Sequence, residues 1–165
     1  MAAAVIRHDF ESRMNLGGAQ QMKADKQTET EVIKTLESML AAYGEKDLEN
    51  VMMHYAKDPD VTAVGTNLDQ LMIGIQRIQE AYQEDFDGFS KLGISMNAYH
   101  ISAEGHVAWV CASCAASFEV EGDEVRSNAR LTAVLVKRDN HWLIVQFHVS
   151  FPADQQGTEV TPYRL

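Results

Sequence analysis

Cys111 and Cys114 are the two cysteines of the chain, and their C-x-x-C spacing occurs both in redox pairs and in half of a zinc site. A redox pair needs a helix N-terminus to lower the thiol pKa, but the flanking residues 107–110 and 115–118 have the composition of a strand. Residues three apart on a strand point to opposite faces, so these thiols diverge. A zinc site would also need a second ligand pair, which the sequence lacks. We therefore predict two buried or half-buried structural cysteines, reduced as in a cytoplasmic protein, and no metal site.

Arg130 precedes residues 131–136, a mostly apolar run that is typical of a buried strand. A buried guanidinium has to be paired, so it meets either a protein carboxylate or an anionic group of a ligand. His148 also lies in an apolar run, where a lone histidine is more often structural than functional. The sequence contains no glycine-rich nucleotide loop and no serine nucleophile elbow, so we predict no cofactor.

The charge balance of the 165 residues excludes further classes of function. The chain has 14 basic and 24 acidic residues, a net charge of −10, which argues against binding to nucleic acid or to an anionic membrane surface. It has no run of about 18 apolar residues, and its first residues do not resemble a signal peptide. We therefore expect a cytoplasmic protein without a membrane anchor.

Hydrophobic spacing divides the chain into an N-terminal extension over residues 1–28, a domain over 29–152 and a C-terminal tail over 153–165. The extension has apolar residues at a spacing that allows one short helix. In the domain, the pattern predicts a first helix that starts near Thr28 or Thr30 and stops at Gly44. A second helix starts at Asp47. A third runs from residue 75 to about 88.

Strand patterns account for most of the remaining domain. They cover residues 61–65, 71–74, 94–103, 106–120, 124–137 and 142–151. The four long strands are joined by tight turns at 104–105, 121–123 and 139–140, where Gly, Asn or Asp tolerates positive φ. This order predicts an α+β fold, in which a strongly curved antiparallel sheet wraps around three helices as a cone. An open cone is suited to hold a small molecule.

The element order and several local strings resemble the nuclear transport factor 2-like superfamily, and within it the SnoaL-like group, over about residues 30–152. These strings are GEKDL at 44–48, DVTAVGT at 60–66, Gly74, VAWV at 107–110, Arg130-x-Thr132 and KRDNHWLIVQFHVS at 137–150. The last string is also similar to the end of the association domain of calcium/calmodulin-dependent protein kinase II. The resemblance implies the nuclear transport factor 2-like, or cystatin-like, cone. It leaves the reaction open, because the superfamily includes isomerases, dehydratases, cyclases, transport factors and oligomerisation domains.

The isomerase chemistry of that superfamily is not predicted for this chain. A ketosteroid isomerase uses a carboxylate base and an oxyanion hole made of a tyrosine and a protonated aspartate. At the matching positions this chain has no acid in residues 61–65, Met39 in place of the tyrosine and Thr132 in place of the aspartate.

The cyclases and dehydratases of the superfamily need an aspartate, or a histidine–aspartate pair, that projects into the cone. The candidates here are Asp85 and His148, with Arg130 as an anion-binding partner. We assign none of them as catalytic, and the sequence leaves enzymatic activity open.

The predicted turn at residues 139–140 sets the faces of the last two strands. Regular pairing from this turn places Arg130 and Thr132 on the same face as Phe147, which the resemblance identifies as the inside of the cone, unless a bulge shifts the register. His148 then lies on the outer, convex face. We predict a largely apolar ligand with a polar or anionic group at Arg130. The predicted ligand-binding residues are Arg130, Thr132, Ser113, Tyr82, Phe89 and Phe147.

A second hypothesis is a homo-oligomerisation or protein-interaction domain without catalysis. Under this hypothesis the cone is vestigial, and the convex sheet face forms a homodimer. An unpaired Arg130 inside a cavity of several hundred cubic ångströms would favour a ligand. A paired Arg130 and a cone filled by Phe86, Phe147 and Trp109 would favour the interaction domain.

Overall fold

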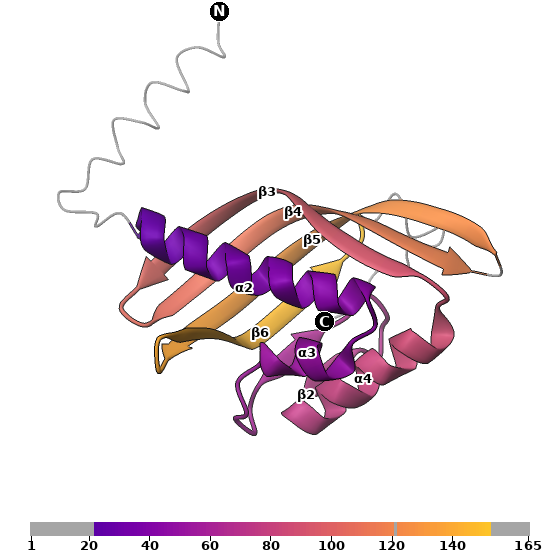
Figure 1. Cartoon of the computed structure of the whole chain (residues 1–165), viewed down its shortest axis with the longest axis horizontal. Coiled ribbons are helices and arrows are strands. Elements are labelled where there is room, and N and C mark those ends of the chain that lie inside the picture. The colour runs from indigo at the N-terminus through magenta and orange to yellow at the C-terminus, as the bar shows by residue number, and fades with distance from the viewer. Residues whose placement is uncertain (1–21, 121, 153–165) are drawn as a thin grey trace, which may run out of the picture.

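The computed structural model describes residues 22–120 and 122–152 of the chain. Its elements follow the predicted order of two helices, two short strands, a third helix and four long strands (Figure 1). The predicted extension up to residue 21 and the predicted tail from residue 153 lie outside the described residues. The helices are α2 (Lys26–Gly44), α3 (Leu48–Met53) and α4 (Ile75–Gly88), and the strands are β1 (Thr62–Val64), β2 (Leu71–Ile73), β3 (Leu92–Glu104), β4 (Val107–Val120), β5 (Asp123–Arg138) and β6 (His141–Ser150).

α2 begins earlier than the sequence predicted, because its N-cap is Asp25 and not a threonine. The Asp25 carboxylate accepts a hydrogen bond from the backbone N–H of Thr28 at 2.8 Å, which satisfies one of the free donors of the first turn. Just before this cap, residues 22–24 run antiparallel to β3, and the backbone N–H of Ala24 donates to the carbonyl of Ile101 at 3.2 Å. This pairing fixes the start of α2 at the edge of the sheet.

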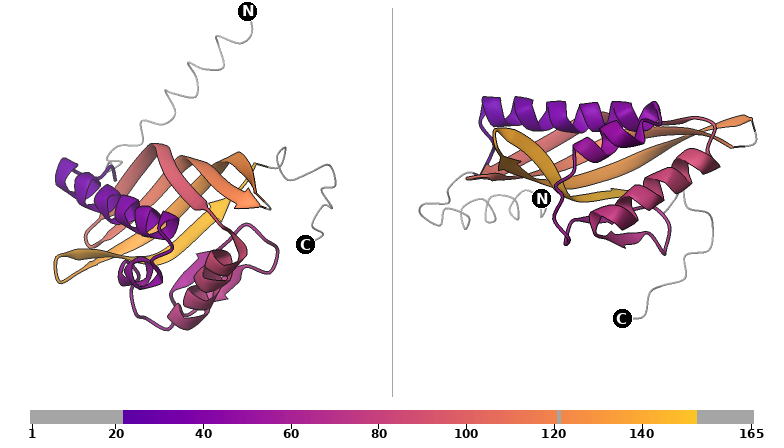
Figure 2. Two further views of the ribbon diagram at one scale, coloured as in Figure 1. Left: turned by 45° about the vertical axis from the view of Figure 1, so that its right-hand side comes forward. Right: turned by 60° about the horizontal axis from the view of Figure 1, so that its bottom comes forward.

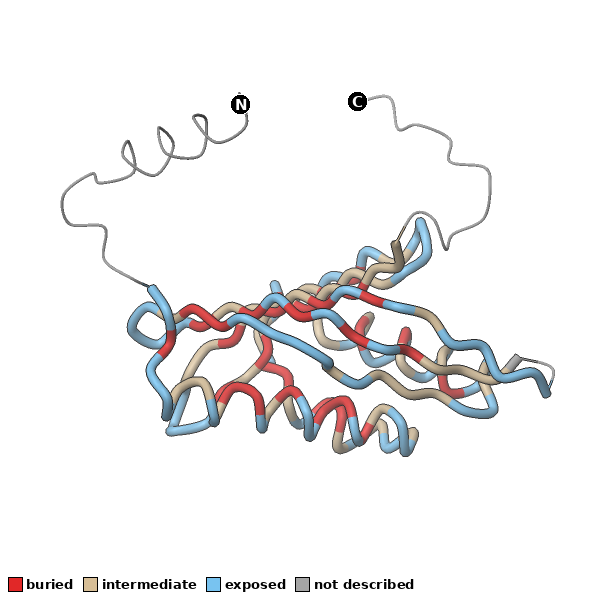
Figure 3. The backbone as a smooth tube through the Cα atoms, turned by 90° about the horizontal axis from the view of Figure 1, so that it is seen from above, coloured by how far each residue is buried: buried red, intermediate tan, exposed pale blue. Residues whose placement is uncertain are grey.

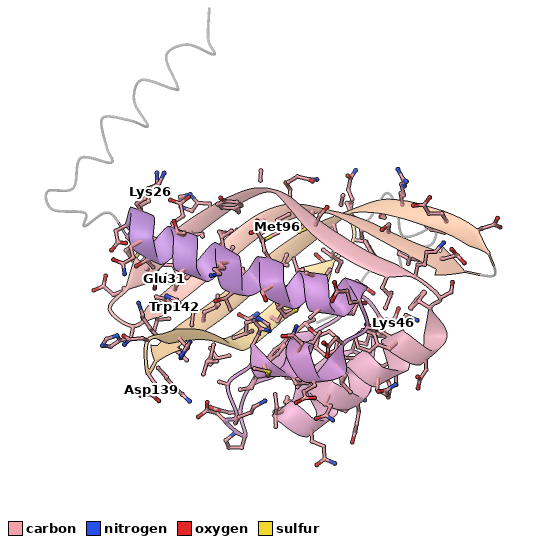
Figure 4. All side chains as sticks on the ribbon, in the orientation of Figure 1. Lys26, Glu31, Lys46, Met96, Asp139 and Trp142 are labelled. Atoms are coloured by element: carbon pink, nitrogen blue, oxygen red, sulfur yellow. The ribbon has the colours of Figure 1, made fainter. Side chains whose placement is uncertain are left out.

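α3 and α4 begin where the sequence predicted. Asp47 caps α3 by accepting a hydrogen bond from the backbone N–H of Asn50 at 3.0 Å. Gly74 precedes α4 with a φ of 87°, a conformation that residues with a Cβ rarely adopt. Lys46, in the loop after α2, lies at the other end of α4 (Figure 4), where its ammonium donates to the carbonyls of Phe86 and Phe89. These contacts place α4 beside the end of α2.

The six strands form one sheet in the order β2-β1-β6-β5-β4-β3, and α2 lies across one of its faces (Figure 2). Neighbouring strands are antiparallel except for β1 and β6, which run parallel. The four long strands form the predicted antiparallel sheet, and the parallel pairing of β1 with β6 makes the whole sheet mixed. The turn between β5 and β6 has positive φ at Asp139 (48°) and Asn140 (63°), as a two-residue hairpin requires.

A β-bulge in β6 decides which side chains face the helices. Pairing is regular from the turn to Leu135 and Ile144, but the next pair is Val134 with Gln146, so that Val145 is left over. Beyond this point every partner moves by one residue, and Arg130 pairs with Ser150. The prediction that Arg130 and Thr132 share a face with Phe147 was therefore wrong. We call the face of the sheet toward α2 the inner face and the opposite one the outer face.

The core lies between α2 and the inner face of the sheet. Val32, Leu36 and Met39 of α2 are fully buried there, against strand residues that include Leu131 and Ile144. The buried segments of α2 and of the strands face each other in Figure 3. On β4 the two cysteines point to opposite faces as predicted, and Cys114 is buried in the core. The predicted burial of Cys111 was wrong, because its side chain lies exposed on the outer face.

A polar cluster joins the first half of α2 to the hairpin of β5 and β6. Glu31 accepts hydrogen bonds from the ammonium of Lys137 at 2.6 Å and from the indole Nε1 of Trp142 at 3.0 Å (Figure 4). The bond from Lys137 is the largest cause that lowers the pKa of Glu31 from 4.5 to about 2. The cluster therefore fixes the position of α2 across the sheet by a charged contact in addition to its apolar face.

Candidate functional site

A cavity of about 330 Å³ lies at one end of the core. Its wall is formed by α2, α4, the β1–β2 hairpin and the ends of β3, β4 and β6. This volume is within the range of small-molecule sites. The space exists because small residues stand where the elements approach one another. These residues are Ala63, Ala81, Gly93 and Ala116. The rest of the wall is largely apolar and aromatic, with Met39, Ile78 and Val149 among its members.

Asp85 of α4 is the single charged side chain in the cavity wall within residues 22–120 and 122–152. It is half-buried, and its Oδ2 accepts a hydrogen bond from the hydroxyl of Tyr43 on α2 at 3.0 Å. Burial raises the pKa of Asp85, and the Tyr43 bond opposes part of this rise. Burial, and the negative charge of Asp85, also raise the pKa of Tyr43, so the tyrosine stays a neutral donor.

Two further tyrosines lie beside this pair. The hydroxyls of Tyr55 and Tyr82 share a hydrogen bond of 2.7 Å, and burial raises the pKa of both. The ring of Tyr82 meets that of Tyr43 edge to face at a centroid distance of 5.7 Å. Phe86 packs behind both rings and is itself buried. The hydroxyl groups are thus held in fixed positions by an aromatic cluster.

The structure places three of the six predicted ligand-binding residues in the cavity wall, namely Tyr82, Phe89 and Phe147. Whether any of the six binds a ligand stays a prediction.

The other three residues, Arg130, Thr132 and Ser113, lie on the outer face and not in the cone, because of the bulge in β6. The guanidinium of Arg130 is exposed and donates to the carbonyl of Phe151 at 3.0 Å. His148 lies on the outer face as predicted, but on the same face as Arg130 and not opposite to it. The predicted contact between Arg130 and an anionic group inside the cone is therefore wrong.

The cone is not filled by the three aromatic residues that the interaction hypothesis named. Trp109 pairs with Val134 on the outer face, and Phe86 packs behind the tyrosines, so only Phe147 lines the cavity.

Sequence analysis named Asp85 beside His148 and Arg130 and did not connect it with Tyr43. Their contact could not be predicted from local patterns, because 42 positions separate the two residues in the sequence. One signal was available: Asp85 follows Ile78, Ala81 and Tyr82 at helical spacing, which puts a carboxylate on the buried side of an amphipathic helix.

Across residues 22–120 and 122–152, no group of three or more His, Cys, Asp or Glu side chains could hold a metal ion. Over the same residues, no helix has the length and apolar character needed to span a bilayer.

The site combines one carboxyl group of raised pKa with a neutral tyrosine donor in an apolar enclosure. In its ionised form Asp85 can accept a hydrogen bond or a proton from a bound molecule, and in its protonated form it can donate one. The described wall contains no second acid and no base. The geometry thus defines an apolar cavity with a single carboxyl group in its described wall.

The chain belongs to the SnoaL-like domain family, whose model matches residues 32–154. None of the curated proteins matches the chain.

Solved structures of the nuclear transport factor 2-like superfamily have the same fold, with low sequence identity. A superfamily protein from Salmonella enterica is 20% identical with a TM-score of 0.68, and the match covers 76% of this chain and 92% of that one. A proposed calcium/calmodulin dependent protein kinase II association domain from Xanthomonas campestris is 20% identical with a TM-score of 0.69, over 84% of this chain and 99% of that one. A proposed dehydratase from Streptomyces avermitilis is 16% identical with a TM-score of 0.69, over 74% and 94%. At these identities the similarity establishes the α+β fold predicted from the sequence and leaves the activity open.

Proposed function

We propose that this SnoaL-like domain binds a small, largely apolar molecule in the cavity between α2, α4 and the sheet. The observation that carries the proposal is the cavity itself, about 330 Å³ of space with a largely apolar and aromatic wall. This cavity is partly open to solvent, so its apolar wall faces water, and a molecule that fills it removes that apolar surface from water.

The test uses a neutral probe, 2-(1-naphthyl)ethanol, whose binding is measured by isothermal titration calorimetry and by naphthyl fluorescence. Ala116→Leu places a larger side chain in the wall and should weaken binding at least about tenfold, since the probe and the new side chain compete for the same volume. Ala115→Leu is the matched control. It adds the same atoms one residue away on the exposed outer face and should leave binding unchanged.

Absence of binding by the native protein at millimolar probe would overturn the proposal. Equal effects of Ala116→Leu and Ala115→Leu would overturn it as well, because the probe would then bind elsewhere.

We also propose, as a second function, that the outer face forms a homodimer. Two rows of side chains cross all six strands there without an Asp, Glu, Lys or Arg, on a chain whose net charge is −10. Leu71 and Ile73 are 65% and 62% exposed in these rows. The rows are Ile73, Thr62, Gln146, Val134, Trp109 and Ser102, and Leu71, Val64, His148, Thr132, Cys111 and His100.

An uncharged strip of two rows on a strongly acidic protein fits a second copy of the same chain, because charged surfaces of two copies would repel each other. Thr132→Glu puts a carboxylate at the centre of this face and should convert a dimer to a monomer in analytical ultracentrifugation. Gln79→Glu adds the same charge on the exposed side of α4 and should leave the dimer intact. A monomeric native protein at concentrations of about 100 µM, well above the dissociation constant of a stable dimer, would overturn this proposal.

A further inference from the structure

We propose that the ligand of the cavity is an apolar molecule with a protonated amine, and that Asp85 binds the ammonium group while the surrounding aromatic rings contact its apolar part. The inference rests on the proposed small-molecule function and specifies the chemical class of the ligand.

The cavity wall has a negative charge that no cation of the described residues neutralises. Asp85 contributes a carboxylate, and the other lining residues within the described part of the chain contribute no Lys, Arg or His. Two ammonium groups lie close in sequence to this wall, and both are engaged elsewhere. Lys46 donates to the carbonyls of Phe86 and Phe89, and Lys91 forms an ion pair with Glu119 at 2.6 Å. The carboxylate therefore lacks a cationic partner of its own among the described residues. A ligand cation would neutralise it and offset the cost of its burial.

The position of Asp85 on its helix supports the same charge sign. It lies in the last turn of α4, where the free carbonyls carry the negative end of the helix dipole. The ammonium of Lys46 already binds carbonyls at this end. Because this ammonium occupies the helix end, the charge that remains to repel an anionic ligand is the carboxylate of Asp85.

Hydrogen bonding leaves one oxygen of Asp85 available. Tyr43 donates to Oδ2, and no hydrogen bond to Oδ1 occurs among the described residues. Every buried side-chain nitrogen and oxygen in that part of the chain has a hydrogen-bond partner. Since Oδ1 of Asp85 has none, this atom is not buried. An ammonium can therefore bind Oδ1 without displacing Tyr43, which holds the carboxylate in place.

Aromatic side chains surround the same space. Tyr43, Tyr82, Phe89, Phe118 and Phe147 all line the cavity. Tyr43 meets Tyr82 at a centroid distance of 5.7 Å, and Phe89 meets Phe118 at 5.6 Å. Aromatic faces attract a cation within about 6 Å, and they also pack against apolar groups. A carboxylate in an aromatic enclosure is a combination that favours an alkylammonium over a neutral or anionic head group.

Three probes of nearly equal shape test the inference, 2-(1-naphthyl)ethylamine, 2-(1-naphthyl)ethanol and 1-naphthylacetate. At pH 7.5 the native protein should bind the amine at least about tenfold more tightly than the alcohol, because the bond to the carboxylate is then charge-assisted. The acetate should bind least. Asp85→Asn keeps the shape and a hydrogen-bond acceptor for Tyr43 but removes the charge, and should bring amine and alcohol to within about twofold.

Proton linkage provides a second readout. The amine is protonated between pH 5 and 8, so its advantage over the alcohol should grow as Asp85 ionises with rising pH. Three titratable groups face Asp85, namely Tyr43 on α2 and Tyr82 and Glu84 on α4. The cavity-lining residues of the described strands add no titratable group. Both tyrosines stay neutral in this range, since burial raises the pKa of each.

The outcomes separate this inference from the proposed function. If the alcohol binds and is blocked by Ala116→Leu, but the amine has no advantage or keeps it in Asp85→Asn, the inference is overturned and the proposed function stands. If none of the three probes binds, the proposed function fails.

Discussion

Tyr43→Phe removes one hydroxyl group and keeps the ring that packs against Tyr82 and Phe86 at 5.7 and 5.6 Å. The lost interaction is the 3.0 Å hydrogen bond to the half-buried carboxylate of Asp85. A hydrogen bond to a charged group contributes about 1.5–3 kcal/mol, and the partial exposure of Asp85 reduces this to about 1–2 kcal/mol. We therefore expect the free energy of unfolding at pH 7 to fall by that amount, equivalent to about 4 °C in Tm per kcal/mol.

The pH dependence of this loss follows from the sign of the pKa effect. The Tyr43 hydroxyl favours the ionised form of Asp85, so its removal raises the pKa of Asp85 further above the ordinary value. The destabilisation should be complete at a pH where Asp85 is ionised and should fade as the pH falls below the pKa of Asp85. Carboxyl carbon NMR of Asp85 measures the pKa directly, and urea unfolding at neutral and acidic pH measures the stability.

A double-mutant cycle with Asp85→Ala isolates the pair, and Tyr99→Phe serves as the control, because Tyr99 is 45% exposed at the sheet edge. The coupling energy at pH 7 should be about 1–2 kcal/mol. Additive effects within about 0.5 kcal/mol, or an equal loss at acidic pH, would refute the assignment of this bond to an ionised Asp85.

Glu31→Gln should reduce the loss of stability in acid, because the ionised form of Glu31, with its pKa lowered from 4.5 to about 2, stabilises the native state above pH 4.5 and less as the pH falls toward 2. Denaturant midpoints between pH 6 and pH 2 measure this, and equal acid sensitivity of both proteins would contradict it. Asn140→Ala should cost about 1 kcal/mol because φ is 63°, whereas Asn140→Gly should be nearly neutral. Thermal unfolding compares the two, and equal losses would mean that the turn conformation is not the cause. Arg130→Ala should leave the affinity for 2-(1-naphthyl)ethanol within about twofold, since the guanidinium lies on the outer face. A tenfold loss in a calorimetric titration would place Arg130 in the site after all.

Local patterns in the sequence determined the elements and their order. Helical spacing of apolar residues and the caps at Asp47 and Gly74 predicted where α3 and α4 begin. Turn chemistry at Asp139 and Asn140 predicted the hairpin of β5 and β6. These features could be predicted because each depends on residues within a few positions of one another.

The inner and outer faces of β5 and β6 were decided by tertiary structure. A single bulge at Val145 moves every later pair by one residue, and because side chains alternate along a strand, it moves Arg130 from the predicted inside of the cone to its outside. Before the bulge the sequence does not mark it, since residues 142–145 are apolar on both faces; after it, polar and apolar residues alternate over 146–150, which indicates that Phe147 and Val149 share one face but does not relate that face to the residues before the bulge.

The candidate site was likewise beyond the reach of local patterns. Sequence analysis predicted the apolar character of the cavity and three residues of its wall, Tyr82, Phe89 and Phe147. It did not predict that Tyr43 donates to Asp85, because this contact joins two helices across 42 positions. The sequence by itself determined which helices and strands form. The packing of α2 against α4 decided which polar groups meet in the cavity, because that meeting depends on distances in space and not on spacing along the chain.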